Sequence, residues 1–100
     1  MEKDKRLDYI RDHVKDENLL VQWAKECFEL GKAVLKLQRE IRKGPDKANA
    51  SKVMRLLNDV QEEITDVNVC AEVMDIPAVP DIRDYKLERW TERIEDGDCL

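Results

Sequence analysis

The sequence predicts an all-α protein, a helical bundle built on two long antiparallel helices with a shorter helix at each end. Two long segments carry apolar residues at alternating steps of three and four, the period of an amphipathic helix. Only three glycines and three prolines interrupt the 100 residues, and 41% of the residues are charged while 5% are aromatic, a composition typical of helical proteins. A chain of this length corresponds to one domain, residues 1–100, with 1–6 and 96–100 expected to be loose.

Charge and cysteine content narrow the classes of function. The net charge is −5, so we expect no general electrostatic attraction to nucleic acid or to an anionic membrane. No stretch is apolar enough to span a membrane, and the charged segment 1–6 has no apolar run behind it to form a signal peptide. Because Cys27, Cys70 and Cys99 form no CxxC pair, we expect reduced thiols in a cytoplasmic protein, with Cys27 and Cys70 in the core.

The first half of the chain is predicted to form a short helix followed by a long one. A first helix of about two turns is indicated by an apolar stripe made of Leu7, Ile10 and Val14. Asp16 is expected to cap the second helix, residues 17–42, which ends at Gly44-Pro45. Its expected buried residues are Leu20, Trp23, Cys27, Leu30, Val34, Leu37 and Ile41.

The second half is predicted to form a long helix followed by a short one. Residues 52–75 repeat the helical pattern, with Ser51 as the expected N-cap. Their expected buried residues are Val53, Leu56, Leu57, Val60, Ile64, Val67, Ala71 and Met74. Pro77 and Pro80 interrupt the pattern, and residues 81–95 are predicted to form the last helix. Its less regular stripe consists of Ile82, Tyr85, Leu87, Trp90 and Ile94.

Two pairs of acids, Glu26 with Glu29 and Glu63 with Asp66, are spaced i, i+3 and therefore share a helix face. Within each pair the acids lie roughly 60° and roughly 120° to the same side of the apolar stripe, so an antiparallel hairpin through the short link 44–50 brings all four into one cleft. Such like charges repel unless a hard cation binds them, and carboxylates are natural Mg²⁺ ligands. With 23 acids in the chain, ordinary solvated helix faces are the alternative.

The acid motifs and their flanks resemble a known family. The stretch 26–30 reads Glu-Cys-Phe-Glu-Leu, running on to Lys-Leu at 36–37, and the stretch 62–67 reads Glu-Glu-Ile-Thr-Asp-Val. The ending 86–93 reads Lys-Leu-Glu-Arg-Trp-Thr-Glu-Arg. Over roughly 8–95, the chain resembles the all-α nucleoside triphosphate pyrophosphohydrolases, the MazG-like superfamily that includes dimeric dUTPases and dCTPases.

Two features depart from the family's pattern. Lys25 stands where many members have a second acid, which could weaken metal binding or change the choice of base. In addition, the 33 residues between Glu29 and Glu63 exceed the spacer that is common in the family.

The resemblance implies hydrolysis of the α–β phosphoanhydride of a nucleoside triphosphate, giving a monophosphate and pyrophosphate. It implies Mg²⁺, with Mn²⁺ as the alternative ion, held by Glu26, Glu29, Glu63 and Asp66, with one carboxylate as general base. It also implies a homodimer or homotetramer whose four-helix core is shared between chains. Neither the base nor the sugar of the nucleotide is indicated.

Other polar residues could contact such a substrate. The alternative is an ordinary surface charge for each cation, a helix-start residue for Asn18 and a partly buried polar residue for Asn68. Cations suited to phosphate oxygens are Lys32, Lys36, Lys86, Arg89 and Arg93. The amides of Asn18 and Asn68 could contact a base edge or a sugar hydroxyl.

The residues argue against two other classes of function and leave two further ones open. A di-iron bundle needs Glu-x-x-His motifs, whereas the only histidine is His13, far from the acids. A zinc hydrolase lacks His and Cys ligands. A non-catalytic helical protein-interaction module stays open, as does a nucleotide-binding relative without turnover. Stabilisation by divalent metal separates a ligand site from a scaffold.

Overall fold

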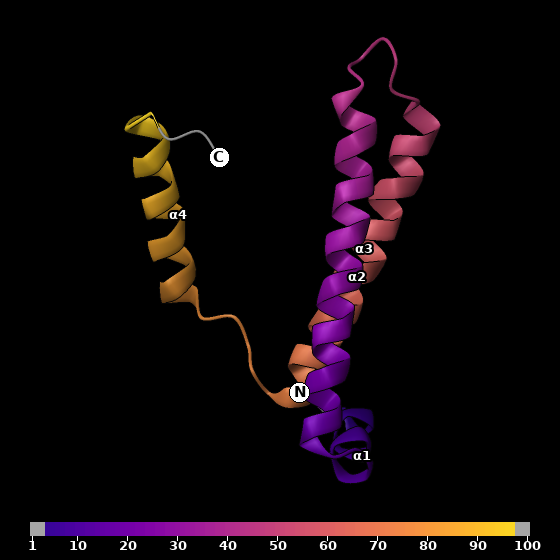
Figure 1. The fold of residues 1–100 in the computed structure, drawn as a ribbon. Coiled ribbons are helices and arrows are strands. Elements are labelled where there is room, and N and C mark those ends of the chain that lie inside the picture. The colour runs from indigo at the N-terminus through magenta and orange to yellow at the C-terminus, as the bar shows by residue number, and fades with distance from the viewer. Residues whose placement is uncertain (1–3, 98–100) are drawn as a thin grey trace.

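The structure is a computed structural model that describes residues 4–97, and every regular element in that range is a helix. The helices are α1 (Lys5–His13), α2 (Asp16–Arg42), α3 (Ala50–Met74) and α4 (Pro80–Glu95). The helices α2 and α3 run antiparallel, side by side, and are joined at one end by the loop 43–49 (Figure 1). This arrangement confirms the predicted all-α fold of two long antiparallel helices with a shorter helix at each end.

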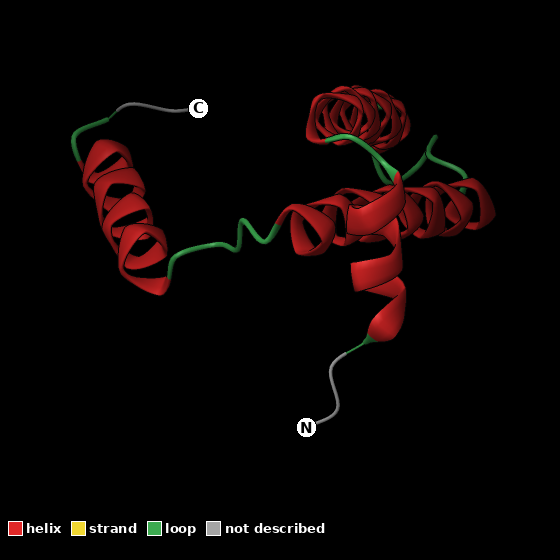
Figure 2. Cartoon of the chain, turned by 90° about the horizontal axis from the view of Figure 1, so that it is seen from below, coloured by secondary structure: helices red, strands yellow, loops and turns green. Residues whose placement is uncertain are grey.

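The two short helices sit differently relative to this hairpin. Arg11 of α1 donates from Nε to the carbonyl oxygen of Val73 at 2.6 Å and from Nη2 to that of Glu72 at 2.7 Å. These bonds reach two carbonyl groups in the last turn of α3, of which that of Glu72 also accepts a 3.1 Å hydrogen bond from the backbone N–H of Asp75. In contrast, α4 buries no residue and lies apart from the other helices (Figures 1 and 2).

Two predicted helix caps are wrong because both long helices begin before the expected residue. Asp16 is the first residue of α2, and Lys15 occupies the cap position. Similarly, α3 begins at Ala50, so Ser51 lies inside it. The cap of α3 is Asn49, whose side chain accepts a hydrogen bond of 3.0 Å from the backbone N–H of Lys52.

The chain ends also differ in part from the prediction. The Asp4 side chain accepts a 3.0 Å hydrogen bond from the backbone N–H of Arg6, so α1 starts at Lys5 within the segment that was expected to be loose. The rest of that segment, residues 1–3, lies outside the described residues, as do 98–100 with Cys99. Pro80 begins α4, a position where its missing N–H leaves no hydrogen bond unmade.

The face that α2 turns toward α3 is not the predicted stripe. Its least exposed residues recur at steps of four and three: Leu19, Trp23, Glu26, Leu30, Ala33, Leu37 and Glu40. We call this the inner line of α2. Of the residues expected to be buried, these are exposed: Leu20, Cys27, Val34 and Ile41. They form a second apolar line, which we call the outer line. The predicted apolar stripe therefore combined residues of two separate lines, and its mean direction lay between them.

The helix α3 likewise has an inner line that differs from its predicted apolar stripe. Its inner line consists of Val53, Leu56, Val60, Glu63, Val67, Cys70 and Met74. The two residues Leu57 and Ile64, which were predicted to be buried, are exposed. The core is consequently small: among the described residues, the buried apolar side chains are Ala33, Leu56 and Val73. Three positions of the two inner lines carry glutamate, and these positions organise the rest of the molecule.

The described helices contain no membrane-crossing candidate. None of those within residues 4–97 combines the length and the apolar character that such a crossing requires.

Candidate metal centre

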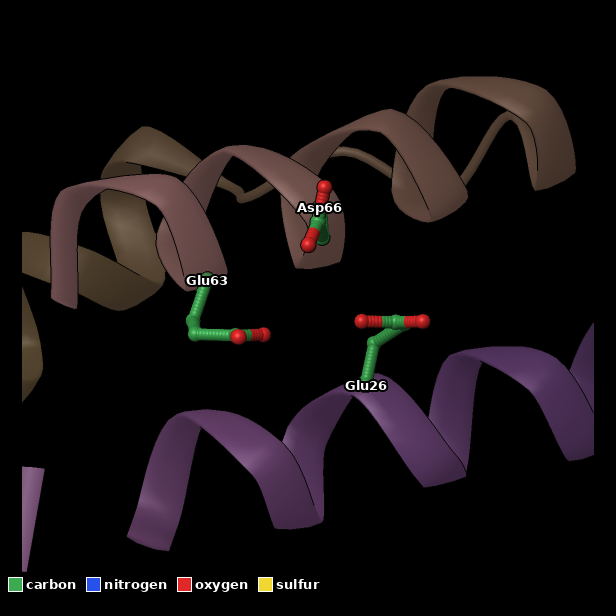
Figure 3. A group of neighbouring side chains, drawn as sticks. All are labelled: Glu26, Glu63 and Asp66. Atoms are coloured by element: carbon green, nitrogen blue, oxygen red, sulfur yellow. The ribbon is translucent and has the colours of Figure 1, made fainter. Parts of the chain in front are cut away.

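Three carboxylates meet between the two long helices. Glu26 comes from α2, and Glu63 and Asp66 lie one turn apart on α3. One carboxylate oxygen of each lies within 4.8 Å of those of the other two. Figure 3 shows the three side chains directed into the space between the helices. We call this group the three-carboxylate cluster, and it unites residues from both acid motifs.

The cluster is partly shielded from water and incompletely bonded. Glu26 and Glu63 are half-buried, whereas Asp66 is exposed. Gln22 Nε2 donates a hydrogen bond of 2.6 Å to Glu26 Oε1. In contrast, Glu63 Oε2 is buried and has no hydrogen-bond partner among the described residues. A buried carboxylate oxygen without a partner is unfavourable, so Glu63 lacks a positively charged or hydrogen-donating neighbour at this oxygen.

The electrostatics of the cluster are dominated by like charge. Burial raises the pKa of Glu63 above its ordinary value of 4.5, and the negative charges of Asp66, Glu26, Glu29 and Glu62 raise it further. Within residues 4–97, no lysine or arginine forms an ion pair with any of the three cluster acids. The cluster therefore holds excess negative charge that the described protein does not neutralise.

The negative charges of the cluster also affect the pKa of a nearby thiol, that of Cys70. Burial raises the pKa of Cys70 above its ordinary value, and the carboxylates of Glu26 and Asp66 and the thiol of Cys27 add to the effect. Cys70 is half-buried, as expected of a core residue, but Cys27 is exposed, so its predicted place in the core is wrong. A protonated Cys70 beside the cluster is a neutral wall residue and contributes no anionic ligand.

Glu29, the fourth predicted acid, does not join the cluster. It lies one turn beyond Glu26 and roughly 60° around the helix from it, where Lys32 Nζ approaches its Oε1 at 3.5 Å. Its charge nevertheless contributes to the raised pKa of Glu63. Glu29 is therefore a rim residue. Its charge acts on Glu63, but its carboxylate is not one of the three that lie within 4.8 Å of one another.

The predicted positions of the cluster acids relative to the apolar stripes also need correction. Glu26 and Glu63 were expected to flank the stripes, yet both lie within the inner lines. The reason is the rotation of both helices, which places the outer apolar lines toward solvent. The glutamates consequently face each other more directly than the sequence predicted.

The other predicted substrate contacts lie at separate places. Lys36 lines a cavity near the loop that joins α2 and α3. Asn68 lines a cavity of about 430 Å³ between α1 and the end of α3. Asn18 is exposed in the first turn of α2, and Lys32 is the partner of Glu29. The structure gathers none of these side chains into the three-carboxylate cluster.

The three cations of the last helix are farther from the hairpin. Lys86, Arg89 and Arg93 line a cavity of about 280 Å³ on α4 itself, beside Trp90. Arg89 also stacks over the Tyr85 ring, with its guanidinium carbon 5.8 Å from the ring centroid. Because α4 lies apart from the hairpin (Figure 2), these cations do not reach the cluster within one chain.

Two residues of functional interest, one beside the cluster and one farther along α2, were missed by the sequence reasoning. Gln22 contacts Glu26, and its i, i+4 spacing on one helix was the available signal. Glu40 is 2% exposed and sits on the inner line two heptads after Glu26. Only the burial identifies Glu40, because its spacing alone does not separate it from the other acids of α2.

The donor set of the cluster fits a hard divalent cation. It offers carboxylate oxygens from three side chains, and Mg²⁺ prefers oxygen ligands and commonly takes only a few of them from protein. Mn²⁺ accepts the same ligands, whereas structural zinc sites use Cys and His. The buried, unpartnered Glu63 Oε2 is the observation that favours a bound cation most directly.

Comparison of this chain with models of protein families, with curated proteins and with solved structures gave no match. The resemblance to MazG-like pyrophosphohydrolases therefore rests on the two acid motifs, the residues that flank them and the ending 86–93.

Proposed function

We propose that this protein is a Mg²⁺-dependent nucleoside triphosphate pyrophosphohydrolase, which cleaves the α–β phosphoanhydride and releases a monophosphate and pyrophosphate. The observation that carries the proposal is the three-carboxylate cluster, in which two motifs far apart in sequence supply oxygens within 4.8 Å of one another. Both motifs are those on which the family resemblance rests. A neutralising cation is what this group of like charges lacks.

Each acid has a role that follows from its place. Glu26, Glu63 and Asp66 are the residues that would hold Mg²⁺ or Mn²⁺, and the ion would supply the positive charge that a triphosphate requires. Glu29, outside the cluster at its rim, is placed to accept the proton of the attacking water. Lys32 lies beside Glu29 and offers an ammonium group to a phosphate oxygen.

The proposal includes assembly as a homodimer or homotetramer in the cytoplasm. Apolar side chains are exposed on the outer line of α2, at Leu20, Val34 and Ile41, and on the corresponding face of α3, at Ile64. Pairing these faces between two copies would bury them and produce a four-helix core. The free thiols of Cys27 and Cys70 suit a reducing compartment.

A non-catalytic interaction module is the second candidate. It is favoured by the same exposed outer lines and by α4, whose apolar Ile82, Trp90 and Ile94 are all about half exposed or more. A partner protein that covered these surfaces would stabilise the chain without using the acids. Lys25, in place of an acid, leaves a third candidate, a relative that binds nucleotides without turnover.

The test is release of pyrophosphate from a panel of canonical and modified nucleoside triphosphates, with Mg²⁺, with Mn²⁺ and with EDTA. We expect metal-dependent release that falls about 100-fold or more in Glu63→Gln, since the site then loses one of its charged ligands. The matched control is Glu72→Gln, an exposed acid of the same helix outside the cluster, which should retain activity. No release from any nucleotide, together with no thermal shift from metal, would place the interaction module ahead.

A further inference from the structure

A second charged site lies between the cluster and the loop end of the hairpin. A cavity of about 580 Å³ opens where α2 and α3 approach their connecting loop. We call it the hairpin-tip pocket. Its cationic lining residues are Lys36, Arg39, Lys43, Lys52 and Arg55. Against these five it has two acids, Glu40 and Asp59, so it holds an excess of three positive charges in a chain whose net charge is −5.

Glu40 anchors two of the five cations. Its carboxylate is 2% exposed on the inner line of α2. Lys43 Nζ lies 2.8 Å from Oε2, and Lys52 Nζ, from the opposite helix, lies 3.5 Å from Oε1. The hydrogen bond from Lys43 lowers the pKa of Glu40, so the carboxylate is charged at neutral pH. Glu40 therefore fixes one lysine on each wall of the pocket.

The remaining three cations are not held in ion pairs. Within residues 4–97, Lys36, Arg39 and Arg55 form no ion pair. Lys36 and Arg39 are one turn apart on α2, so their like charges repel, while Arg55 faces the pocket from α3. The two acids of the pocket, Glu40 and Asp59, offset only part of this charge, so both walls present cations that are available to an anion.

Ordinary helix electrostatics accounts for only part of this arrangement. Arg39 and Lys43 are near the C-terminal end of α2, where cations are favourable. Lys52 and Arg55 are near the N-terminal end of α3, where cations are unfavourable, and the first turn of α3 has no acid. The helix dipole therefore does not explain the cations on the α3 side of the pocket.

We propose that the hairpin-tip pocket binds a small polyanion with two or more phosphate groups, separately from the metal centre. Its volume falls in the range of about 300–1,000 Å³ that is usual for small-molecule sites. Guanidinium groups such as those of Arg39 and Arg55 bind phosphate through paired hydrogen bonds. An extended nucleic acid would run beyond the pocket onto a chain of net negative charge.

The two arginines of the pocket lie apart from the cluster along both helices. Arg39 follows Glu26 by 13 residues on α2, and Arg55 precedes Glu63 by 8 residues on α3. At 1.5 Å per residue these separations are about 20 Å and about 12 Å, while the lining residue Asp59 lies about 6 Å from Glu63 along α3. A titration without metal therefore tests the pocket apart from the metal centre, and binding there does not require the proposed hydrolysis.

The test is calorimetric titration of the full chain with inorganic tripolyphosphate in EDTA. Without metal the three-carboxylate cluster repels a polyanion, so binding reports the basic residues. We expect the double variant Arg39→Gln/Arg55→Gln to weaken binding by about tenfold or more, as expected for the loss of two charge-assisted contacts. The matched control Arg89→Gln/Arg93→Gln removes the same charge from α4 and should stay within about twofold of the unchanged protein.

Three outcomes would overturn the proposal. They are no binding of tripolyphosphate by the unchanged chain, equal weakening in both double variants, and tighter binding of a single-stranded oligonucleotide through the same arginines. The last would assign the surface to nucleic acid. Because Arg39 and Arg55 are both exposed, their replacement should leave the helices intact, which circular dichroism checks. The single variant Lys36→Gln gives an independent measure of the same loss.

Discussion

Glu63 and Glu40 occupy equivalent places and behave in opposite ways. Both lie on the inner lines of the hairpin, where burial disfavours a charged carboxylate. The pKa of Glu63 is raised because burial is reinforced by neighbouring acids. The pKa of Glu40 is lowered because the hydrogen bond from Lys43 and the charges of Lys43 and Lys52 outweigh its burial. In this interface, the charges and hydrogen bonds of adjacent residues decide the ionisation of a glutamate more than its burial does.

The comparison gives the hairpin two poles. The middle of the hairpin holds a cluster without a cation, the acidic pole, and the end near the loop holds a pocket with an excess of cations, the basic pole. Between them the inner lines bury few apolar side chains, so the isolated hairpin has a small core. Ligands of opposite sign at the two poles are therefore expected to stabilise it by mass action.

The largest expected effect comes from metal at the acidic pole. At a concentration of Mn²⁺ about 100 times its Kd, the melting temperature should rise by about 10 °C or more. Glu63→Gln should abolish this rise, because the cluster loses the ligand that lacks a partner. Glu40→Gln should retain it. Differential scanning fluorimetry measures all three, and an equal response in the two variants would remove the distinction between the poles.

A smaller effect is expected without metal, with opposite signs at the two poles. In EDTA, Glu63→Gln should raise the melting temperature by a few degrees, because the variant removes repulsion and an unfavourable buried charge. Glu40→Gln should lower it, because Lys43 and Lys52 lose their shared counter-ion. Thermal melts monitored by circular dichroism check the signs. A loss of stability in both variants would mean that Glu63 contributes favourable packing that its charge does not offset.

The pH dependence should separate the same two residues. Since the folded-state pKa of Glu63 lies above 4.5, the folded protein binds this proton more tightly, and its destabilising charge disappears as the pH falls through the raised pKa. The gain from Glu63→Gln should shrink as the pH falls from neutral toward this raised pKa.

Glu40 should show no such trend in that window. Its folded-state pKa lies below 4.5, so its stabilising charge is present above that value and is lost only as the pH falls through the lowered pKa. Urea titrations in EDTA at several pH values measure both differences. A constant gain for Glu63→Gln across the range would contradict the raised pKa.

The smallest expected effect concerns Asp59, the second acid of the hairpin-tip pocket. Asp59→Asn increases the positive excess of the pocket by one charge, so tripolyphosphate should bind about two- to fivefold more tightly. The same change should leave the response to Mn²⁺ unaltered. Calorimetry in EDTA measures the first quantity and fluorimetry the second. Weaker binding by Asp59→Asn would show that this carboxylate positions a cation and does not merely reduce the charge.

The sequence alone was sufficient for the helices, their lengths and the hairpin. These depend on local regularities: apolar steps of three and four, Gly44 and Pro77 as interruptions, and a short link between the long helices. It also indicated that the two acid motifs would approach each other, because an antiparallel pairing follows from the length of the link. Helix starts were less predictable, since several polar residues near Asp16 and Ser51 could serve as caps.

Only the tertiary structure decided which face of each helix turns inward. Both long helices carry an inner and an outer apolar line, which at about 100° per residue point roughly 80° apart, and periodicity alone does not say which of them faces the partner helix. The rotation of the helices moved Glu26 and Glu63 into the interface, left Glu29 at the rim and buried Glu40 against Lys52 of the opposite helix. These contacts join residues from different helices, so no periodicity within one helix could specify them. The composition of each pole is therefore a property of the packing, whereas its candidate residues could be read from the chain.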